Sequence, residues 1–238
     1  MRRSCAVIIM IEYKRDCMYI LSFDVGIRNL AYSVLYRPDY PQDSQGLKSK
    51  KKQSKTLNQV QVIDCNIINL KKDDEKGAKS VSVETIAKRL LEKLYETFVF
   101  GAPVEYYDVV LIENQPSFLN PTMKAISTMI YTFFMIQTLE NEEKSQVKYI
   151  SPRKKLKVAD KGDASGAPQN GVITAIPPGS RHSKNKYNER KKRAIEYARH
   201  YLKDVIQDPK ALAKFEAHAK KDDCADALLF GIYYLETH

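Results

Sequence analysis

The spacing of apolar residues changes its period about a third of the way along the chain, and this change limits the possible folds. Before residue 80, three runs typical of strands follow one another, at residues 18–23, 30–36 and 60–70. Later apolar residues recur at helical spacing in residues 82–98, 121–139, 188–202 and 212–238, with short apolar runs at 107–112 and 147–150. Strands in succession, followed by alternating helices and strands, predict an α/β domain: a five-stranded mixed sheet, an antiparallel meander and then parallel strands, flanked by helices.

The rest of the chain is predicted to decorate this single domain of residues 18–238. Polar stretches at about 38–57 and 156–186 are predicted to be loop insertions, and residues 1–17 an N-terminal extension that forms an extra strand or a loose segment. The extension imitates a signal peptide, but its apolar part stops at Glu12 and no small-residue cleavage site follows. No apolar run approaches the roughly 18 residues that a membrane helix requires. We therefore expect a protein that is neither secreted nor embedded in a membrane.

Positive charge is concentrated in one part of the sequence. The chain has 39 Lys and Arg against 29 Asp and Glu, and residues 144–221 alone contain 20 basic and 7 acidic residues. This local excess of positive charge favours a polyanionic partner, although a soluble basic protein without such a partner stays an alternative. The four cysteines and four histidines show no zinc-site spacing. We expect reduced thiols and an intracellular, reducing location.

Four acidic residues occur where acids are usually costly. Asp24 ends the first buried strand run, Glu113 ends the short central one, and Asp223 and Asp226 share a helical face. Strand ends of this kind face the functional crevice of an open α/β sheet. Each acid also has a structural explanation, as a turn former, an exposed side chain or a partner of the helix dipole. Spacing alone leaves Asp222 open as well, because it lies four residues before Asp226.

Taken together, the four acids in a basic chain predict a metal site. Clustered carboxylates repel one another unless a divalent cation offsets their charge, and oxygen ligands suit Mg²⁺ or Mn²⁺. Two such ions about 4 Å apart activate water and stabilise a leaving oxygen in phosphodiester cleavage. An acidic metal site within a basic surface is what a nuclease requires.

Three motifs in this order resemble the RuvC-type Holliday junction resolvases of the RNase H-like superfamily. They are Ser-Phe-Asp-Val-Gly-Ile-Arg-Asn at residues 22–29, Leu-Ile-Glu-Asn-Gln-Pro at 111–116 and Lys-Asp-Asp-Cys-Ala-Asp-Ala-Leu at 221–228. The chain is most similar to the poxvirus and large-DNA-virus branch, in which Gln follows the central Glu and a doubled Asp opens the last motif. The stretch at residues 115–124 adds to this likeness.

The resemblance implies a crossover junction endodeoxyribonuclease that cuts four-way DNA junctions during recombination or viral genome processing. It implies an RNase H-like fold, a homodimer, and no small-molecule cofactor. The family's four acids correspond to Asp24, Glu113, Asp223 and Asp226, which would bind two Mg²⁺ ions per active site, with Mn²⁺ as a substitute. A viral protein of this kind would work in the host cytoplasm, a viral factory or the nucleus. Its DNA-contacting positions correspond loosely to five basic residues: Arg153, Lys154, Lys155, Lys191 and Lys192.

Other functions share some of these features. Another RNase H-like nuclease, acting on RNA–DNA hybrids or flaps, would use the same acids, and a binding module would keep the fold without catalysis. The four intact acids argue against the binding module. An actin-like ATPase also begins with Asp-x-Gly, but no second Asp-x-Gly followed by Thr or Ser occurs in the chain. The Met- and Phe-rich helix at residues 121–139 is a candidate dimer surface, with packing in the core as its alternative.

Overall fold

The computed structural model describes residues 17–38, 57–72, 74–75, 81–118, 120–140, 145–155 and 181–238. The predicted N-terminal extension, apart from Cys17, and most of both predicted insertions lie outside these residues.

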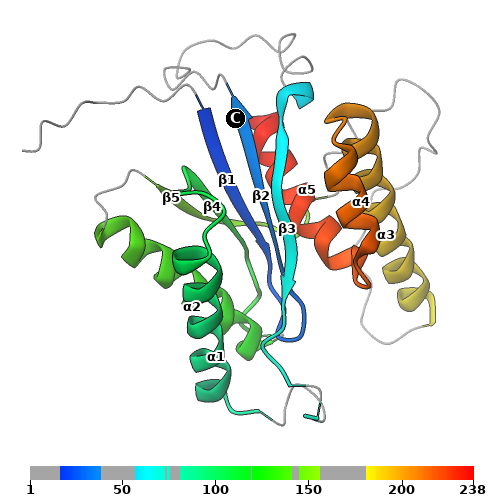
Figure 1. Cartoon of the computed structure of the whole chain (residues 1–238). Coiled ribbons are helices and arrows are strands. Elements are labelled where there is room, and N and C mark those ends of the chain that lie inside the picture. Colours follow the sequence, from blue (N-terminus) through cyan, green and yellow to red (C-terminus); the bar gives the residue numbers. More distant parts are fainter. Residues whose placement is uncertain are drawn as a thin grey trace, which may run out of the picture.

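A five-stranded mixed sheet forms the centre of the domain (Figure 1). Its order is β3-β2-β1-β4-β5, and the strands are β1 (Cys17–Asp24), β2 (Leu30–Pro38), β3 (Gln61–Ile68), β4 (Val109–Glu113) and β5 (Gln146–Ile150). The β1–β2 and β2–β3 pairs are antiparallel, whereas β4 runs parallel to both β1 and β5. The predicted meander followed by parallel strands is therefore confirmed.

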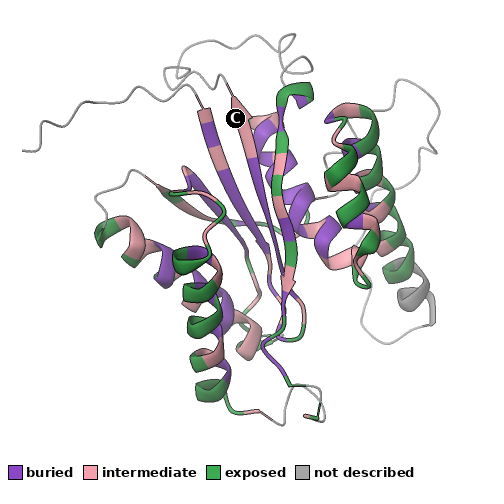
Figure 2. Ribbon diagram, viewed as in Figure 1, coloured by how far each residue is buried: buried purple, intermediate pink, exposed green. Residues whose placement is uncertain are grey.

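One face of the sheet is covered by α1 (Val83–Tyr95) and α2 (Pro121–Glu140). Ser82 begins α1 as a cap, because its side chain accepts a hydrogen bond from the Thr85 backbone N–H. A π-helical turn, Glu96–Phe100, extends α1. The inward side of α2 contributes Ile130, Phe133 and Phe134 to the core (Figure 2). The Met- and Phe-rich side of α2 is thus used largely for core packing.

The opposite face is covered by α3 (Arg181–His200), α4 (Pro209–Ala217) and α5 (Lys221–Thr237). A second π-helical turn, Tyr201–Val205, follows α3. Most of α5 is buried between the sheet and α3, which agrees with its nearly continuous apolar sequence (Figure 2). No described helix is both long enough and apolar enough to cross a membrane.

The helix α5 crosses the sheet from one edge to the other. Near its start, the Cys224 carbonyl oxygen lies 3.9 Å from the Cys65 Sγ on β3. In its middle, the Ala227 carbonyl accepts a hydrogen bond of 2.8 Å from the Ser22 hydroxyl on β1. Near its end, the Tyr234 hydroxyl accepts a hydrogen bond of 3.3 Å from Lys148 on β5. This path places the first turn of α5 beside the carboxyl end of β1.

Two predicted boundaries were wrong. Residues 212–238 form two helices, α4 and α5, because the backbone at His218 is extended (φ −69°, ψ 132°) and its ring nitrogen Nε2 lies 3.1 Å from the Cys65 carbonyl oxygen. Neither Gly nor Pro marks this break in the sequence. In addition, α3 begins at Arg181, inside the predicted insertion at 156–186.

Candidate active site

The carboxyl ends of two neighbouring parallel strands carry the first two predicted acids. Asp24 is the last residue of β1 and Glu113 the last of β4, and the residues before them, Phe23 and Ile112, are paired in the sheet. Because parallel strands end at the same edge, their terminal side chains meet there. Glu113 is close enough to Asp24 to raise the pKa of the Asp24 carboxyl group. The two carboxyl groups form one site.

The side chain of Lys155 joins this pair to α5. Its Nζ lies 3.5 Å from Asp24 Oδ1 and 3.9 Å from Glu113 Oε1, and it also forms a short ion pair with Asp226. Lys155 stands in the turn after β5, whose last residue is level with Glu113 in the sheet. Three carboxyl groups from β1, β4 and α5 therefore surround one ammonium. We call Asp24, Glu113, Asp226 and Lys155 the acid cluster.

Neutral donors hold Glu113 in one orientation. Its Oε2 accepts a hydrogen bond of 2.6 Å from the Gln115 side-chain amide and one of 3.4 Å from the Val25 backbone N–H. The Ser127 hydroxyl on α2 donates to the Glu113 backbone carbonyl at 3.1 Å. Only 7% of the Glu113 surface is exposed. Its second carboxylate oxygen, Oε1, is consequently the one that faces the cation.

Burial makes the charged forms of these acids costly. Desolvation raises the pKa of Asp24 from 3.8 to about 8, although Lys155 acts in the opposite direction and Glu113 adds to the rise. Desolvation likewise raises the pKa of Asp226 to about 7 against the opposing charge of Lys155, and it raises that of Glu113. Burial disfavours the Lys155 ammonium, but the three acids outweigh it and raise the Lys155 pKa. Burial thus favours the protonated forms of these acids, and the charge of one ammonium does not outweigh it.

The two candidates at the start of α5 differ in their partners. Asp222 forms an ion pair with Lys191 of α3, and this contact outweighs partial burial and lowers the Asp222 pKa. Burial, followed by the charge of Asp222, raises the pKa of Asp223, and the side chain of Asn29 acts in the opposite direction. Asp223 also acts on the charge of Asp24. Asp223 therefore lies beside the acid cluster, whereas Asp222 is paired with Lys191 on α3.

The glycine after Asp24 is required by the turn that brings Asn29 close. A Cβ added to Gly26 would lie 2.3 Å from the Asn29 backbone oxygen, a distance that no side chain tolerates. The tight turn from Gly26 to Asn29 thus explains the Asp-x-Gly pattern in terms of backbone packing.

The predicted basic residues occupy three kinds of position. Arg153 and Lys192 are exposed, and Lys154 is half-buried against Tyr233. Lys191 pairs with Asp222, and Lys155 points into the acid cluster. Their roles in DNA contact stay predictions. The sequence pattern did not reveal the place of Lys155 among the acids, because Arg153 and Lys154 follow β5 as well and nothing local separates Lys155 from them.

The donor chemistry of the acid cluster fits a hard divalent cation, since carboxylate oxygens are its only anionic groups. Among the described residues, no group of three or more His, Cys, Asp or Glu side chains has the geometry of a ready-made metal site. The three carboxyl groups all face the Lys155 ammonium. This ammonium therefore occupies a position where the surrounding carboxyl groups favour a cation.

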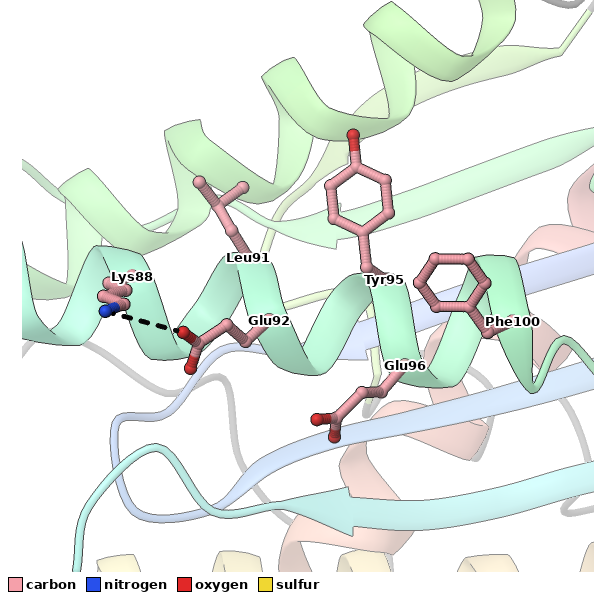
Figure 3. A pocket seen from close by; sticks show the side chains of 6 residues that line it. All are labelled: Lys88, Leu91, Glu92, Tyr95, Glu96 and Phe100. Atoms are coloured by element: carbon pink, nitrogen blue, oxygen red, sulfur yellow. Dashed lines mark ion pairs between the residues drawn. The ribbon is translucent and has the colours of Figure 1, made fainter.

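A shallow hollow on α1 lies away from this chemistry (Figure 3). It has a volume of about 420 Å³, and an ion pair of 3.9 Å joins Lys88 and Glu92 at its border. The rings of Tyr95 and Phe100 line it with Leu91 and Glu96. None of these residues belongs to the acid cluster, so the hollow is not part of the candidate active site.

Comparisons with known proteins agree with this architecture. Residues 20–117 match the family described as mitochondrial resolvase Ydc2 / RNA splicing MRS1, a span that includes Asp24 and Glu113. The fowlpox virus resolvase, solved with Holliday junction DNA, aligns with a TM-score of 0.50 at 20% identity, over 92% of this chain and 98% of that one. The chain therefore has the same fold as this resolvase. The yeast mitochondrial resolvase Ydc2 also aligns with a TM-score of 0.50, at 16% identity, over 92% of this chain and 79% of that one.

A sequence relative from a large DNA virus extends the comparison. The uncharacterized protein L451 of Acanthamoeba polyphaga mimivirus is 35% identical over 131 residues, which are 53% of this chain. The chain spans 28% of the length of that relative. The match to the resolvase family model and the alignments with the two solved resolvases confirm the resemblance and the mixed α/β fold that were predicted from the sequence.

Proposed function

We propose that the protein is an endonuclease that cuts four-way DNA junctions with the help of divalent metal ions. The observation that carries this proposal is the meeting of Asp24, Glu113 and Asp226 around one cation position at the carboxyl edge of a resolvase-type sheet. The match of residues 20–117 to a resolvase family and the net charge of +10 support it.

The four acids Asp24, Glu113, Asp223 and Asp226 would hold two Mg²⁺ ions, and Mn²⁺ would serve in their place. When bound, these ions supply an activated water and stabilise the leaving oxygen of the phosphodiester. The chain contributes a fixed orientation of Glu113, through Gln115 and the Val25 N–H, and a largely buried setting that strengthens electrostatic contacts. Lys155 offsets part of the carboxylate repulsion while the acids are assembled.

Branched DNA would bind through the basic side chains around this edge, with Arg153 and Lys192 as the exposed members of the predicted set. We also propose that the protein acts as a homodimer, so that each subunit nicks one strand of the junction. Because the inward side of α2 is occupied by the core, its dimer contacts would use the outward side, where Ile136 and Leu139 are exposed.

The decisive experiment incubates the full chain with a labelled four-way junction, a linear duplex and an RNA–DNA hybrid, with Mg²⁺ and then with EDTA. We expect cleavage of the junction in Mg²⁺ alone. Asp24→Asn and Glu113→Gln keep the shape of the acid cluster but remove charge, so they should reduce cleavage by orders of magnitude and leave junction binding in place. Cleavage retained by both variants would contradict the metal-site assignment.

A second candidate follows from the description of the matching family, which joins a resolvase with an RNA-splicing protein. Under this alternative the chain binds structured RNA or RNA–DNA hybrids. Preference for the hybrid over the junction, in binding and in cleavage, would replace our proposal with this one.

A further inference from the structure

Two lysines near the acid cluster, Lys148 and Lys154, differ from the lysines that form ion pairs in the described chain. Lys88, Lys93, Lys191 and Lys214 all form ion pairs with carboxylates, of Glu92, Glu96, Asp222 and Asp64 respectively. The ammonium groups of Lys148 and Lys154 instead contact tyrosines. Within the described residues, hydroxyl groups and aromatic rings are the partners recorded for both ammonium groups.

Each of these lysines is held by a hydroxyl and a ring. Lys154 Nζ donates to the Tyr233 hydroxyl at 2.7 Å and lies 5.0 Å from the centre of the Tyr233 ring. Lys148 Nζ donates to the Tyr234 hydroxyl at 3.3 Å and lies 5.3 Å from the Tyr234 ring centre. Ring and hydroxyl fix the ammonium without cancelling its charge. The half-buried Tyr233 accepts from Lys154, so its own O–H proton is still available to an anion.

The pairs continue the acid cluster along α5. Asp226, Phe230 and Tyr233 lie on one face of the helix, at spacings of four and three residues. Lys155, whose ammonium contacts Asp226, lies 5.4 Å from the centre of the Phe230 ring, and Lys154 covers the next ring, that of Tyr233. Seven residues separate Asp226 from Tyr233, which is about 10 Å along a helix axis. That length is about three base steps of duplex DNA at 3.4 Å each.

We propose that the Lys154–Tyr233 and Lys148–Tyr234 pairs bind backbone phosphates of the DNA on one side of the scissile phosphate. The inference rests on the proposed function, because it takes the acid cluster as the point of cleavage. Ammonium groups that a ring and a hydroxyl already hold in place suit phosphate, since little side-chain freedom is lost on binding. The competing explanation is that both lysines only stabilise the carboxyl end of α5, where positive charge is favourable.

The test measures DNA binding by the full chain in EDTA, using fluorescence anisotropy with a labelled four-way junction and a labelled duplex over a series of salt concentrations. The variant Lys148→Gln/Lys154→Gln should lower the log–log salt slope by about 1 to 2 units, or about 0.9 for each lost phosphate contact. The matched control Lys88→Gln/Lys93→Gln removes the same charge from α1, on the opposite face of the sheet, and should keep the wild-type slope.

Two further variants separate charge from positioning. Lys148→Arg/Lys154→Arg retains both charges and should retain the slope. Tyr233→Phe removes only a hydroxyl, so it should raise Kd at every salt concentration while the slope stays unchanged. These variants also keep the test valid if the glutamine variant folds poorly, which the thermal unfolding midpoint reveals.

An unchanged salt slope in a folded glutamine variant overturns the inference. If the thermal unfolding midpoint of that variant is also lowered, the lysines serve to stabilise the carboxyl end of α5 instead. Failure of the proposed function looks different. Wild-type protein that binds DNA but neither prefers nor cuts the junction contradicts junction resolution, yet its salt slope on either DNA still decides whether these lysines contact phosphates.

Discussion

Replacing Gly231 with Ala tests how closely α5 approaches the sheet. A Cβ added to Gly231 would lie 2.7 Å from Leu35 Cδ1, 3.4 Å from Leu35 Cγ and 3.2 Å from the Ser22 hydroxyl oxygen. Leu35 and Ser22 are fully buried, so neither can move away into solvent. The extra methyl group must therefore displace the Leu35 side chain inside the core or move α5 away from the β1–β2 strands.

The size of the effect follows from two opposing contributions. Overpacking a buried site costs about 1–3 kcal/mol, and a contact this short belongs in the upper part of that range. Ala is favoured over Gly inside a helix by about 1 kcal/mol. We therefore expect Gly231→Ala to lower the unfolding free energy by about 1–2 kcal/mol, and to lower junction cleavage because α5 carries Asp226.

The assay is urea unfolding followed by far-UV circular dichroism and by tyrosine fluorescence, because the chain contains 15 Tyr and no Trp. The matched variant is Leu35→Val, which removes the Cδ1 that the new methyl group would meet. The double variant should be more stable than the sum of the two single losses by about 1 kcal/mol. Two results would contradict this reasoning. Either Gly231→Ala is as stable as the wild type, or the losses of unfolding free energy in Gly231→Ala and Leu35→Val simply add in the double variant.

Further predictions concern the site and the chain ends. Asp223→Asn should abolish single-turnover junction cleavage across a Mg²⁺ titration, whereas Asp222→Asn should lose at most about tenfold, or about 1.4 kcal/mol of barrier, and the reverse order would show that the last motif is misassigned. In EDTA, the unfolding free energy should fall as pH rises from about 4 to about 8, because Asp24 with its pKa near 8 binds more protons in the folded than in the unfolded state. Asp24→Asn should flatten this fall in urea titrations at pH 5 and 8, and equal pH dependence would refute the assignment. Lys192→Ala should reduce the salt slope by about 0.9 on junction and duplex alike, and an unchanged slope would place the DNA surface elsewhere. A chain starting at Met18 should fold and cleave like the full protein, and insoluble material would show that the preceding residues belong to the core.

The strands and the two strand-end acids were predictable because each depends on a local pattern. The runs before Asp24 and Glu113 are apolar over nearly the whole length of a buried strand, and the parallel pairing of these strands brings both acids to one edge of the sheet. The break between α4 and α5 was not predictable, because it depends on the contact of His218 with Cys65, which is distant in sequence. Tertiary contacts outweighed local periodicity there.

The acid cluster was predictable only in part, because it too depends on contacts between residues that are distant in sequence. Acid residues stand out in apolar surroundings, so three of its members were found. Lys155 belongs to a basic stretch in which nothing local distinguishes it from its neighbours. Its role depends on the direction of the turn after β5, and the choice between Asp222 and Asp223 depends on Lys191 from another helix.

The path of α5 also sets when the molecule can become complete during its synthesis. The hydrogen bond between the Ser22 hydroxyl and the Ala227 carbonyl spans 205 residues, and Asp24 and Asp226 are separated by almost the same length of chain. At about 5–20 residues per second, Asp226 leaves the ribosome about 10 to 40 s after Asp24. The strands can pair in this interval and bring Asp24 and Glu113 together, but Asp226 is still missing. A nascent chain without α5 therefore carries three of the four members of the acid cluster, and the cluster is completed only when that helix is made.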